Sequence, residues 1–338
     1  MNLWKSPMMR CSINIILLSC GCWFAGCAGA PPVSQSKPSP LGVRYSQRDS
    51  DLAANRRKFL SFTHANHPGQ HVGYRFFEHE PMVRGAVPRD AAAAGIESAY
   101  ASRLQREFAN RAGVFTADYS VNDEGWIRQD WRLYFAPAAD GLDVLLVIQT
   151  HEEGLPEWYA IQQCLRMGGK TNIPWRREVA CSPAFSEYDI WAREAHQGRK
   201  TSLSYVHMNG EWLALPAEKE AVGARTPLGK KYDWRCYNGV LPERVGPYQA
   251  RMLGTMDDMA IARRSEDGQW VCGMYWQGMT HMSNHHPADC LHAVVNIGNV
   301  PANCKRAVLG KIYWFLGNLE DLANKVAHDF HIHQQSGG

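Results

Sequence analysis

The chain has 338 residues, of which 45% are hydrophobic and 20% are charged, so it is long and apolar enough to bury a large core. Its formal net charge is +3 and it has no long basic run, which argues against nucleic acid as a partner. The twelve Trp and thirteen Tyr residues fit a packed core, and exposed members of such a set stack on sugar rings.

Residues 1–27 have the composition of a targeting segment. Lys5 and Arg10 supply positive charge ahead of an apolar stretch that begins at Ile13 and runs through Phe24. This stretch is too short and too rich in Cys and Gly for a good membrane span, and no later stretch of the sequence is suited to one. The segment therefore predicts export.

The end of this segment resembles the lipobox of bacterial lipoproteins. Residues 24–27 read FAGC, with Phe where Leu is usual, and place small residues before Cys27. Residues 17–20, LLSC, match the lipobox consensus better but leave a very short apolar region, and a plain secretory signal is a third interpretation. We expect lipid attachment at Cys27, with the lipid anchor as the protein's contact with a membrane.

The next part of the chain predicts a tether followed by one domain. Residues 28–50 are dominated by Pro, Ser and Gln and cannot bury a face, so they predict a disordered tether. We expect a single domain over residues 51–333. It begins with a short helix over 51–62, a polar, His-containing loop over 64–71 and a strand over 72–79.

A long helix is predicted between Asp90, which is a good N-cap, and Gly113. The alanines after Asp90 are strong helix formers. Its apolar residues recur every four positions and predict one buried stripe: Ile96, Tyr100, Leu104 and Phe108.

From here the pattern changes to strands, ending in one last helix. The expected strands cover residues 127–135, 142–150, 158–165, 203–207, 212–215, 259–264, 270–277, 291–297 and 307–315. Turns are predicted at Asp140-Gly141, Asn209-Gly210 and Asp267-Gly268. Asn318 caps a closing helix with an apolar face of Leu319, Leu322, Val326 and Phe330. We therefore predict a mainly β protein, a large antiparallel β-sandwich with a long helix near its N-terminal side and a closing C-terminal helix.

The cysteines beyond the signal region are even in number, which in an oxidising compartment favours disulfides without fixing their pairing. The alternative is that several of them are small buried hydrophobic residues. The six are Cys164, Cys181, Cys236, Cys272, Cys290 and Cys304.

Residues 270–292, WVCGMYWQGMTHMSNHHPADCLH, are the most polar and chemically varied stretch between two expected strands. We expect residues 276–292 to form a polar loop that joins two strands of the same sheet and lines a sugar pocket. Trp276, and Trp270 as a second candidate, would stack on a sugar ring, with Trp276 reaching past the sheet edge. The expected ligand-binding residues are Trp276, His281, Asn284, His286 and Asp289.

Two other interpretations of this stretch stay open. His281 and His285 are four apart, which on a helix would place both on one face as metal ligands, with Asp289 or His292 completing a set. Asn284 and the proline after His286 favour a loop over this helix. In the other interpretation the loop has only a structural role, with the proline fixing its turn and Cys290 in a disulfide. No G-x-S-x-G elbow, P-loop or dinucleotide-binding glycine pattern is present.

The last third of the chain resembles the ending of uncharacterised secreted bacterial proteins. The resemblance rests on Asn284, residues 290–292 (CLH), Pro301 and residues 310–317 (GKIYWFLG) before a short helix. It implies a galactose mutarotase-like, carbohydrate-associated β-sandwich. Because mutarotase-type enzymes use a His general acid and a carboxylate base, the resemblance implies His285 and His292 as catalytic candidates by residue type, with no carboxylate identified as the base.

Together these patterns predict an exported, lipid-anchored envelope protein that binds or processes carbohydrate and needs no cofactor. The alternatives are a non-catalytic structural lipoprotein and a metal-binding protein that uses the same histidines.

Overall fold

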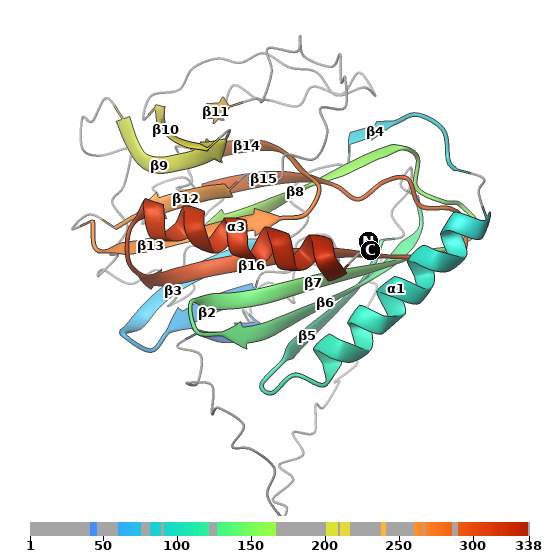
Figure 1. Ribbon diagram of the computed structural model, residues 1–338, viewed down its shortest axis with the longest axis horizontal. Helices are drawn as coiled ribbons and strands as arrows, with labels where there is room; N and C mark the ends of the chain where they lie inside the picture. Colours follow the sequence, from blue (N-terminus) through green and yellow to red (C-terminus); the bar gives the residue numbers. More distant parts are fainter. Residues whose placement is uncertain are drawn as a thin grey trace, which may run out of the picture. The chain divides into compact units, whose positions relative to one another are not determined.

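Two antiparallel β-sheets pack face to face in the computed structural model (Figure 1). The structure describes residues 41–45, 60–75, 82–88, 91–121, 127–166, 201–208, 210–216, 238–240, 260–265, 268–285 and 290–336. All of these belong to one compact unit, Lys37–Gly338. The predicted antiparallel β-sandwich is confirmed.

Sheet 1 has eight strands within the described ranges, in the order β1-β2-β3-β8-β15-β14-β11, and β4 also pairs with β8. Their bounds are β1 (Leu41–Tyr45), β2 (Leu60–His64), β3 (His67–Arg75), β4 (Met82–Arg84), β8 (Trp158–Arg166), β11 (Asn238–Val240), β14 (Met279–His285) and β15 (Cys290–Asn296).

Sheet 2 also has eight strands among the residues that are described, in the order β10-β9-β12-β13-β16-β7-β6-β5. Their bounds are β5 (Phe115–Val121), β6 (Gln129–Ala138), β7 (Gly141–Thr150), β9 (Thr201–Met208), β10 (Glu211–Pro216), β12 (Ala260–Arg264), β13 (Trp270–Trp276) and β16 (Lys305–Leu316).

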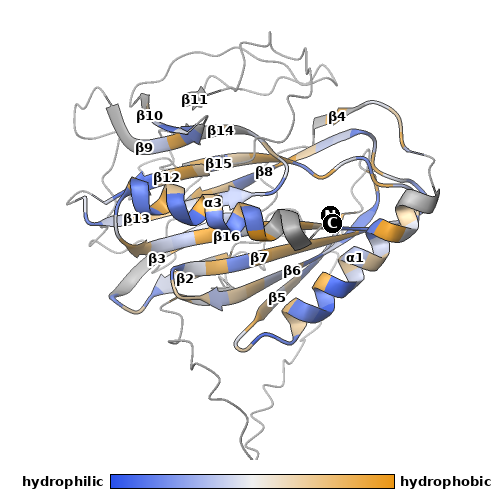
Figure 2. Cartoon of the chain, in the orientation of Figure 1, coloured by the Kyte–Doolittle hydropathy of each residue, from blue (hydrophilic) through white to orange (hydrophobic). Residues whose placement is uncertain are grey.

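The core lies between the sheets because strand residues alternate between two faces. On β6, Trp131, Leu133 and Phe135 point into the core, while Tyr134 and Ala136 on the opposite face pack under a helix. Figure 2 shows the resulting hydrophobic colouring along the central strands of sheet 2 and hydrophilic residues on the exposed side of the last helix.

Two helices, α1 (Ala91–Ala109) and α3 (Leu319–Ser336), cover the outer face of sheet 2 (Figure 1). At the start of α3 the side chain of Asn318 accepts a hydrogen bond from the backbone of Asp321, and Asp321 accepts one from the backbone of Asn318. This reciprocal cap confirms the predicted start of the helix. The predicted apolar face is confirmed as well, because Leu322 and Val326 are buried against sheet 2.

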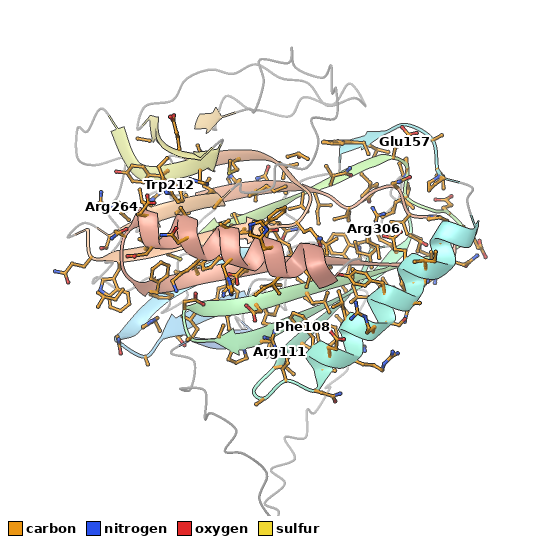
Figure 3. All side chains as sticks on the ribbon, in the orientation of Figure 1. Phe108, Arg111, Glu157, Trp212, Arg264 and Arg306 are labelled. Carbon is orange, nitrogen blue, oxygen red and sulfur yellow. The ribbon has the colours of Figure 1, made fainter. Side chains whose placement is uncertain are left out.

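The predicted stripe on α1 is correct at one end and wrong at the other. Leu104 and Phe108 pack on sheet 2, and Phe108 and Arg111 lie where α1 meets β5, β6 and β7 (Figure 3). Ile96, in contrast, is 74% exposed. A four-residue step turns about 40° more than one helical turn, so over three steps Ile96 drifts about 120° from Phe108.

The N-terminal part of the domain departs from the prediction. Residues 60–62, expected at the end of a helix, belong to β2, and the expected loop over 64–71 is the tight turn and first half of a β2–β3 hairpin. Within the expected tether, residues 41–45 form β1 and pair with β2. The expectation of a structureless tether is therefore wrong for these five residues, and the rest of residues 28–50 lies outside the described part of the chain.

The predicted hairpins are observed. β6 pairs with β7 across the Asp140 turn, β9 with β10, and β12 with β13, all antiparallel. At Gly141 a side chain has no room, since an added Cβ would lie 1.9 Å from the carbonyl oxygen of Ile312. Neither described helix is long and apolar enough to cross a membrane.

Candidate functional site

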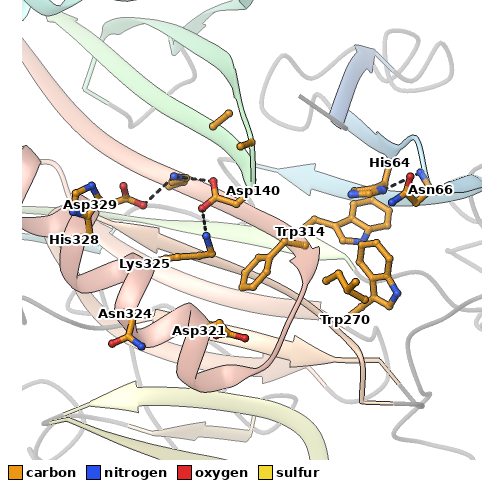
Figure 4. Close-up of a pocket in the computed structure, with 15 residues that line it drawn as sticks. His64, Asn66, Asp140, Trp270, Trp314, Asp321, Asn324, Lys325, His328 and Asp329 are labelled. Carbon is orange, nitrogen blue, oxygen red and sulfur yellow. Dashed lines mark hydrogen bonds and ion pairs between the residues drawn. The ribbon is translucent and has the colours of Figure 1, made fainter. Parts of the chain in front are cut away.

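A cleft of about 950 Å³ opens where several strands of both sheets end, and we call it the end cleft (Figure 4). Residues from the end of β2, the β6–β7 turn, the start of β13, the second half of β16 and α3 line it. Its lining residues are His64, Asn66, Ala138, Ala139, Asp140, Trp270, Lys311, Trp314, Phe315, Leu316, Asp321, Asn324, Lys325, His328 and Asp329.

One end of the cleft is aromatic. The His64 ring lies 5.0 Å from that of Trp270, edge to face, and 5.2 Å from that of Trp314. The backbone N–H of Asn66 donates to Nδ1 of His64 over 3.1 Å, so the β2–β3 turn fixes the ring. Trp314 is buried, whereas Trp270 is half-buried and lies opposite Leu316, which is 64% exposed. Trp270 and Leu316 therefore give this end an apolar surface that a ligand can contact.

The other end of the cleft is charged. The Lys311 ammonium is 3.0 Å from Asp140, 3.0 Å from Asp329 and 3.5 Å from Asp143, and only 8% of its side chain is exposed. Lys325, whose side chain is 36% exposed, lies 3.0 Å from the second oxygen of Asp140. Three carboxylates therefore surround the Lys311 ammonium, two of them at hydrogen-bonding distance. Lys325 keeps donors for a ligand.

The ionisation states at this end are set by these contacts. Burial alone would raise the pKa of Asp140, but Lys311 and Lys325 outweigh it and the pKa is lowered. Burial works to lower the pKa of Lys311, and the three carboxylates reverse this and raise it. The Tyr313 hydroxyl donates to Asp329 over 2.8 Å, and burial followed by this carboxylate raises its pKa well above the usual value. At neutral pH the Asp140 carboxylate and the Lys311 ammonium are therefore charged, and the Tyr313 phenol beside them is neutral.

This arrangement suits a polyhydroxylated ligand. Aromatic and aliphatic side chains pack on the C–H face of a sugar ring, while carboxylate, amide and ammonium groups bond its hydroxyls. Asn324 and His328 are exposed on α3 and form no hydrogen bond within the described part of the chain, so both are available to a ligand. Asp140 stays ionised and thus accepts hydrogen bonds rather than supplying a proton.

The expected polar loop over residues 276–292 is different in the structure. β13 ends at Trp276, a turn at Gln277-Gly278 leads into β14, and β14 pairs with β15. Because β13 belongs to sheet 2 and β14 and β15 to sheet 1, the expectation that the stretch joins two strands of one sheet is wrong. The chain crosses between the sheets at this turn.

The expectation that Trp276 reaches past the sheet edge is also wrong. Its side chain is 1% exposed and belongs to the core between the sheets. It lies flat on Gly310, where an added Cβ would be 2.5 Å from the indole, and its ring is parallel to that of Tyr74 within 11°. Trp270, the second candidate in the sequence, lines the end cleft together with Trp314.

The remaining predicted residues lie away from the end cleft or outside the described ranges. His281, Asn284 and His285 are on β14, where residues four apart are about 13 Å apart along the strand, so His281 and His285 do not share the helix face that the metal alternative requires. His286 and Asp289 lie outside the described residues. In the described part of the chain no group of three or more His, Cys, Asp and Glu side chains could hold a metal ion.

His292 is completely buried on β15, opposite Cys164 of β8 and Ser283 of β14. It does not line the end cleft. The catalytic roles expected for His285 and His292 stay predictions.

Of the six cysteines beyond the signal region, Cys164, Cys272 and Cys304 have described side chains. Cys272 and Cys304 carry free thiols. Cys164 and Cys272 are completely buried, as expected for the small hydrophobic alternative. Burial raises the pKa of the Cys272 thiol. Cys181 and Cys236 lie outside the described residues.

Sequence reasoning missed the charged end of the cleft, although the sequence contains one signal for it. Lys311 is a lone charge inside the apolar run AVLGKIYWFL, and a charge in a buried strand requires a partner. The sequence does not reveal that the partners come from a turn and from the closing helix.

Comparison with known proteins gives a likeness of fold. No protein-family model and no curated protein matches the chain. Among solved structures it is similar to a galactose mutarotase-related enzyme from Lactobacillus acidophilus, with a TM-score of 0.36 and 7% identity over 79% of this chain and 97% of that one. An aldose 1-epimerase candidate from Escherichia coli K12 matches with a TM-score of 0.36 and 6% identity over 82% of this chain and all of that one.

A third match is an alpha-N-acetylgalactosaminidase from Bifidobacterium bifidum in complex with GalNAc. The TM-score is 0.35, the identity is 11%, and the match covers 82% of this chain and 35% of the other.

Proposed function

We propose that the protein is exported, is anchored in the cell envelope through lipid on Cys27, and binds carbohydrate in the end cleft. The observation that carries the binding proposal is the presence in one cleft of a half-buried tryptophan, Trp270, and of exposed polar side chains on α3, Asn324 and His328. A volume of about 950 Å³ is large enough for a small organic ligand.

Binding is favoured over hydrolysis by the charged end of the cleft. Asp140 is held by two lysines and has a lowered pKa, so it does not act as a general acid at neutral pH. The Lys311 ammonium is surrounded by three carboxylates, so it holds these carboxylates in place and does not react with a ligand. Lys325, which keeps donors for a ligand, and the exposed side chains of Asn324 and His328 are the groups left to bond hydroxyls.

The proposal is tested with a glycan array probed by the full-length protein in detergent, as wild type and as Trp270→Ala. We expect retention of one or more glycans by the wild type and a loss of affinity of about tenfold or more in the variant, which is about 1.4 kcal/mol of binding free energy. Trp212→Ala is the matched control, because Trp212 is also half-buried on sheet 2 but does not line the cleft.

Two results would contradict the proposal. One is a wild-type protein that retains no glycan. The other is an equal loss of affinity in Trp270→Ala and Trp212→Ala, which would place binding elsewhere or show that general destabilisation is responsible.

A further inference from the structure

We infer that the end cleft binds a chain of at least two sugar units rather than a monosaccharide, with one unit at the aromatic end and the next at the charged end. This inference rests on the proposed carbohydrate binding. It follows from the way that α3 runs from one end of the cleft to the other (Figure 4).

The first turn of α3 lies at the aromatic end. A carboxylate oxygen of Asp321 would be 2.9 Å from a Cβ added to Gly317, so Asp321 sits beside the residue that follows Leu316. Leu316 in turn is the register partner of Trp270.

The third turn of α3 lies at the charged end, where Asp329 contacts Lys311 over 3.0 Å and accepts the hydrogen bond from Tyr313. From Asp321 to Asp329 the helix rises about 12 Å, at about 1.5 Å per residue. This is longer than a single pyranose ring, so one ring cannot reach the apolar surface at Trp270 and the polar groups near Asp329 at once.

The two ends offer different and complementary contacts. At the aromatic end, Trp270 and Leu316 provide apolar area for a ring face. Further along α3, Asn324 and His328 are four residues apart on one face, and Lys325 lies between them with its ammonium 5.1 Å from the centre of the Phe315 ring. A second sugar unit would meet these polar side chains.

Isothermal titration calorimetry with homologous saccharides of one to five units, built on glucose, galactose and N-acetylglucosamine, tests the inference. For the series that binds, we expect affinity to rise at least about tenfold from one unit to two or three and then to level off, a gain of about 1.4 kcal/mol. Trp270→Ala and Asn324→Ala should each lower the affinity for the trisaccharide. The affinity for the monosaccharide should fall in only one of the two variants. His331→Ala, an exposed change on α3 outside the cleft, should leave both affinities unchanged.

The outcomes separate the inference from the function on which it rests. A monosaccharide that binds as tightly as the trisaccharide, and that both variants weaken equally, overturns the two-unit inference and leaves carbohydrate binding in place. Absence of binding by every saccharide in the three series, in a protein that gives the same circular dichroism spectrum before and after titration, overturns both.

Discussion

Lys311 shows how one charged side chain can occupy a buried strand. Its ammonium is compensated by Asp140, Asp143 and Asp329, and Arg111 neutralises Asp143 from the other side over 2.7 Å. Lys311, with 8% of its side chain exposed, would carry a large desolvation cost without these carboxylates. The cluster links the end of α1, the β6–β7 hairpin and α3 through side chains rather than backbone.

We predict that Asp140→Asn changes the free energy of unfolding in a way that depends on pH. The folded-state pKa of Asp140 is lowered, so the carboxylate contributes stability that is fully present above its unfolded pKa of about 3.9 and is lost as the pH falls through the lower folded value. The free energy of urea unfolding should therefore be lower in Asp140→Asn than in the wild type at neutral pH, by about 1–3 kcal/mol, because the variant leaves Lys311 and Lys325 short of a partner.

The difference between the two proteins should shrink as the pH is lowered towards about 3. Asp118→Asn serves as the control, since Asp118 is in an exposed ion pair with Arg132, which contributes little. A wild-type advantage over Asp140→Asn that stays constant from neutral to acidic pH would contradict the assignment of the effect to ionisation.

At the scale of the elements, two glycines are predicted to respond in opposite directions to alanine. Gly95 lies inside α1 with no atom within 4 Å of an added Cβ, so Gly95→Ala should stabilise the protein by about 0.5–1 kcal/mol. Gly310 lies inside β16 against the Trp276 indole, and Gly310→Ala should destabilise it by about 1–3 kcal/mol. Urea unfolding of both variants measures the effects, and a neutral Gly310→Ala would show that the two strands can separate at little cost.

The elements also show which features the sequence predicts. The hairpins follow from short-range chemistry, because Asp-Gly and Asn-Gly turns and alternating strands are local signals. The crossing at Gln277-Gly278 has the same local appearance as a hairpin turn within one sheet, so periodicity cannot distinguish them. The N-terminal His-containing segment resembles a loop in the sequence because its strand character depends on the pairing of β2 with β3 and of β1 with β2.

The candidate site depends still more on long-range contacts. Trp270 was recognised as an aromatic that could contact a sugar, but its exposure relative to Trp276 follows from the packing of Trp276 on Gly310. Asp140 was recognised as a turn residue, and its role beside Lys311 appears only once β16 and α3 are packed against that turn.

At the scale of the whole molecule, the proposed anchor gives a prediction of its own. The apolar stretch before Cys27 and the small residues beside it predict lipid attachment at that cysteine. Cys27→Ser should move the protein from the membrane fraction to the soluble one, and mass spectrometry of the wild-type N-terminus should show the lipid. An unmodified N-terminus that begins beyond residue 27 would reject anchoring and leave export in place.

The position of β16 in sheet 2 has a consequence for the order in which the protein can be completed. This strand lies between β13 and β7, yet residues 305–316 come almost last in the chain. Until they are available, β13 and β7 each present an open edge, and sheet 2 exists as two separate halves. Sheet 2 therefore cannot close until β16, which follows both of its neighbours in the sequence, is inserted between them. Because this closure joins segments that are far apart in the sequence, we expect it to be a late and slow step of folding.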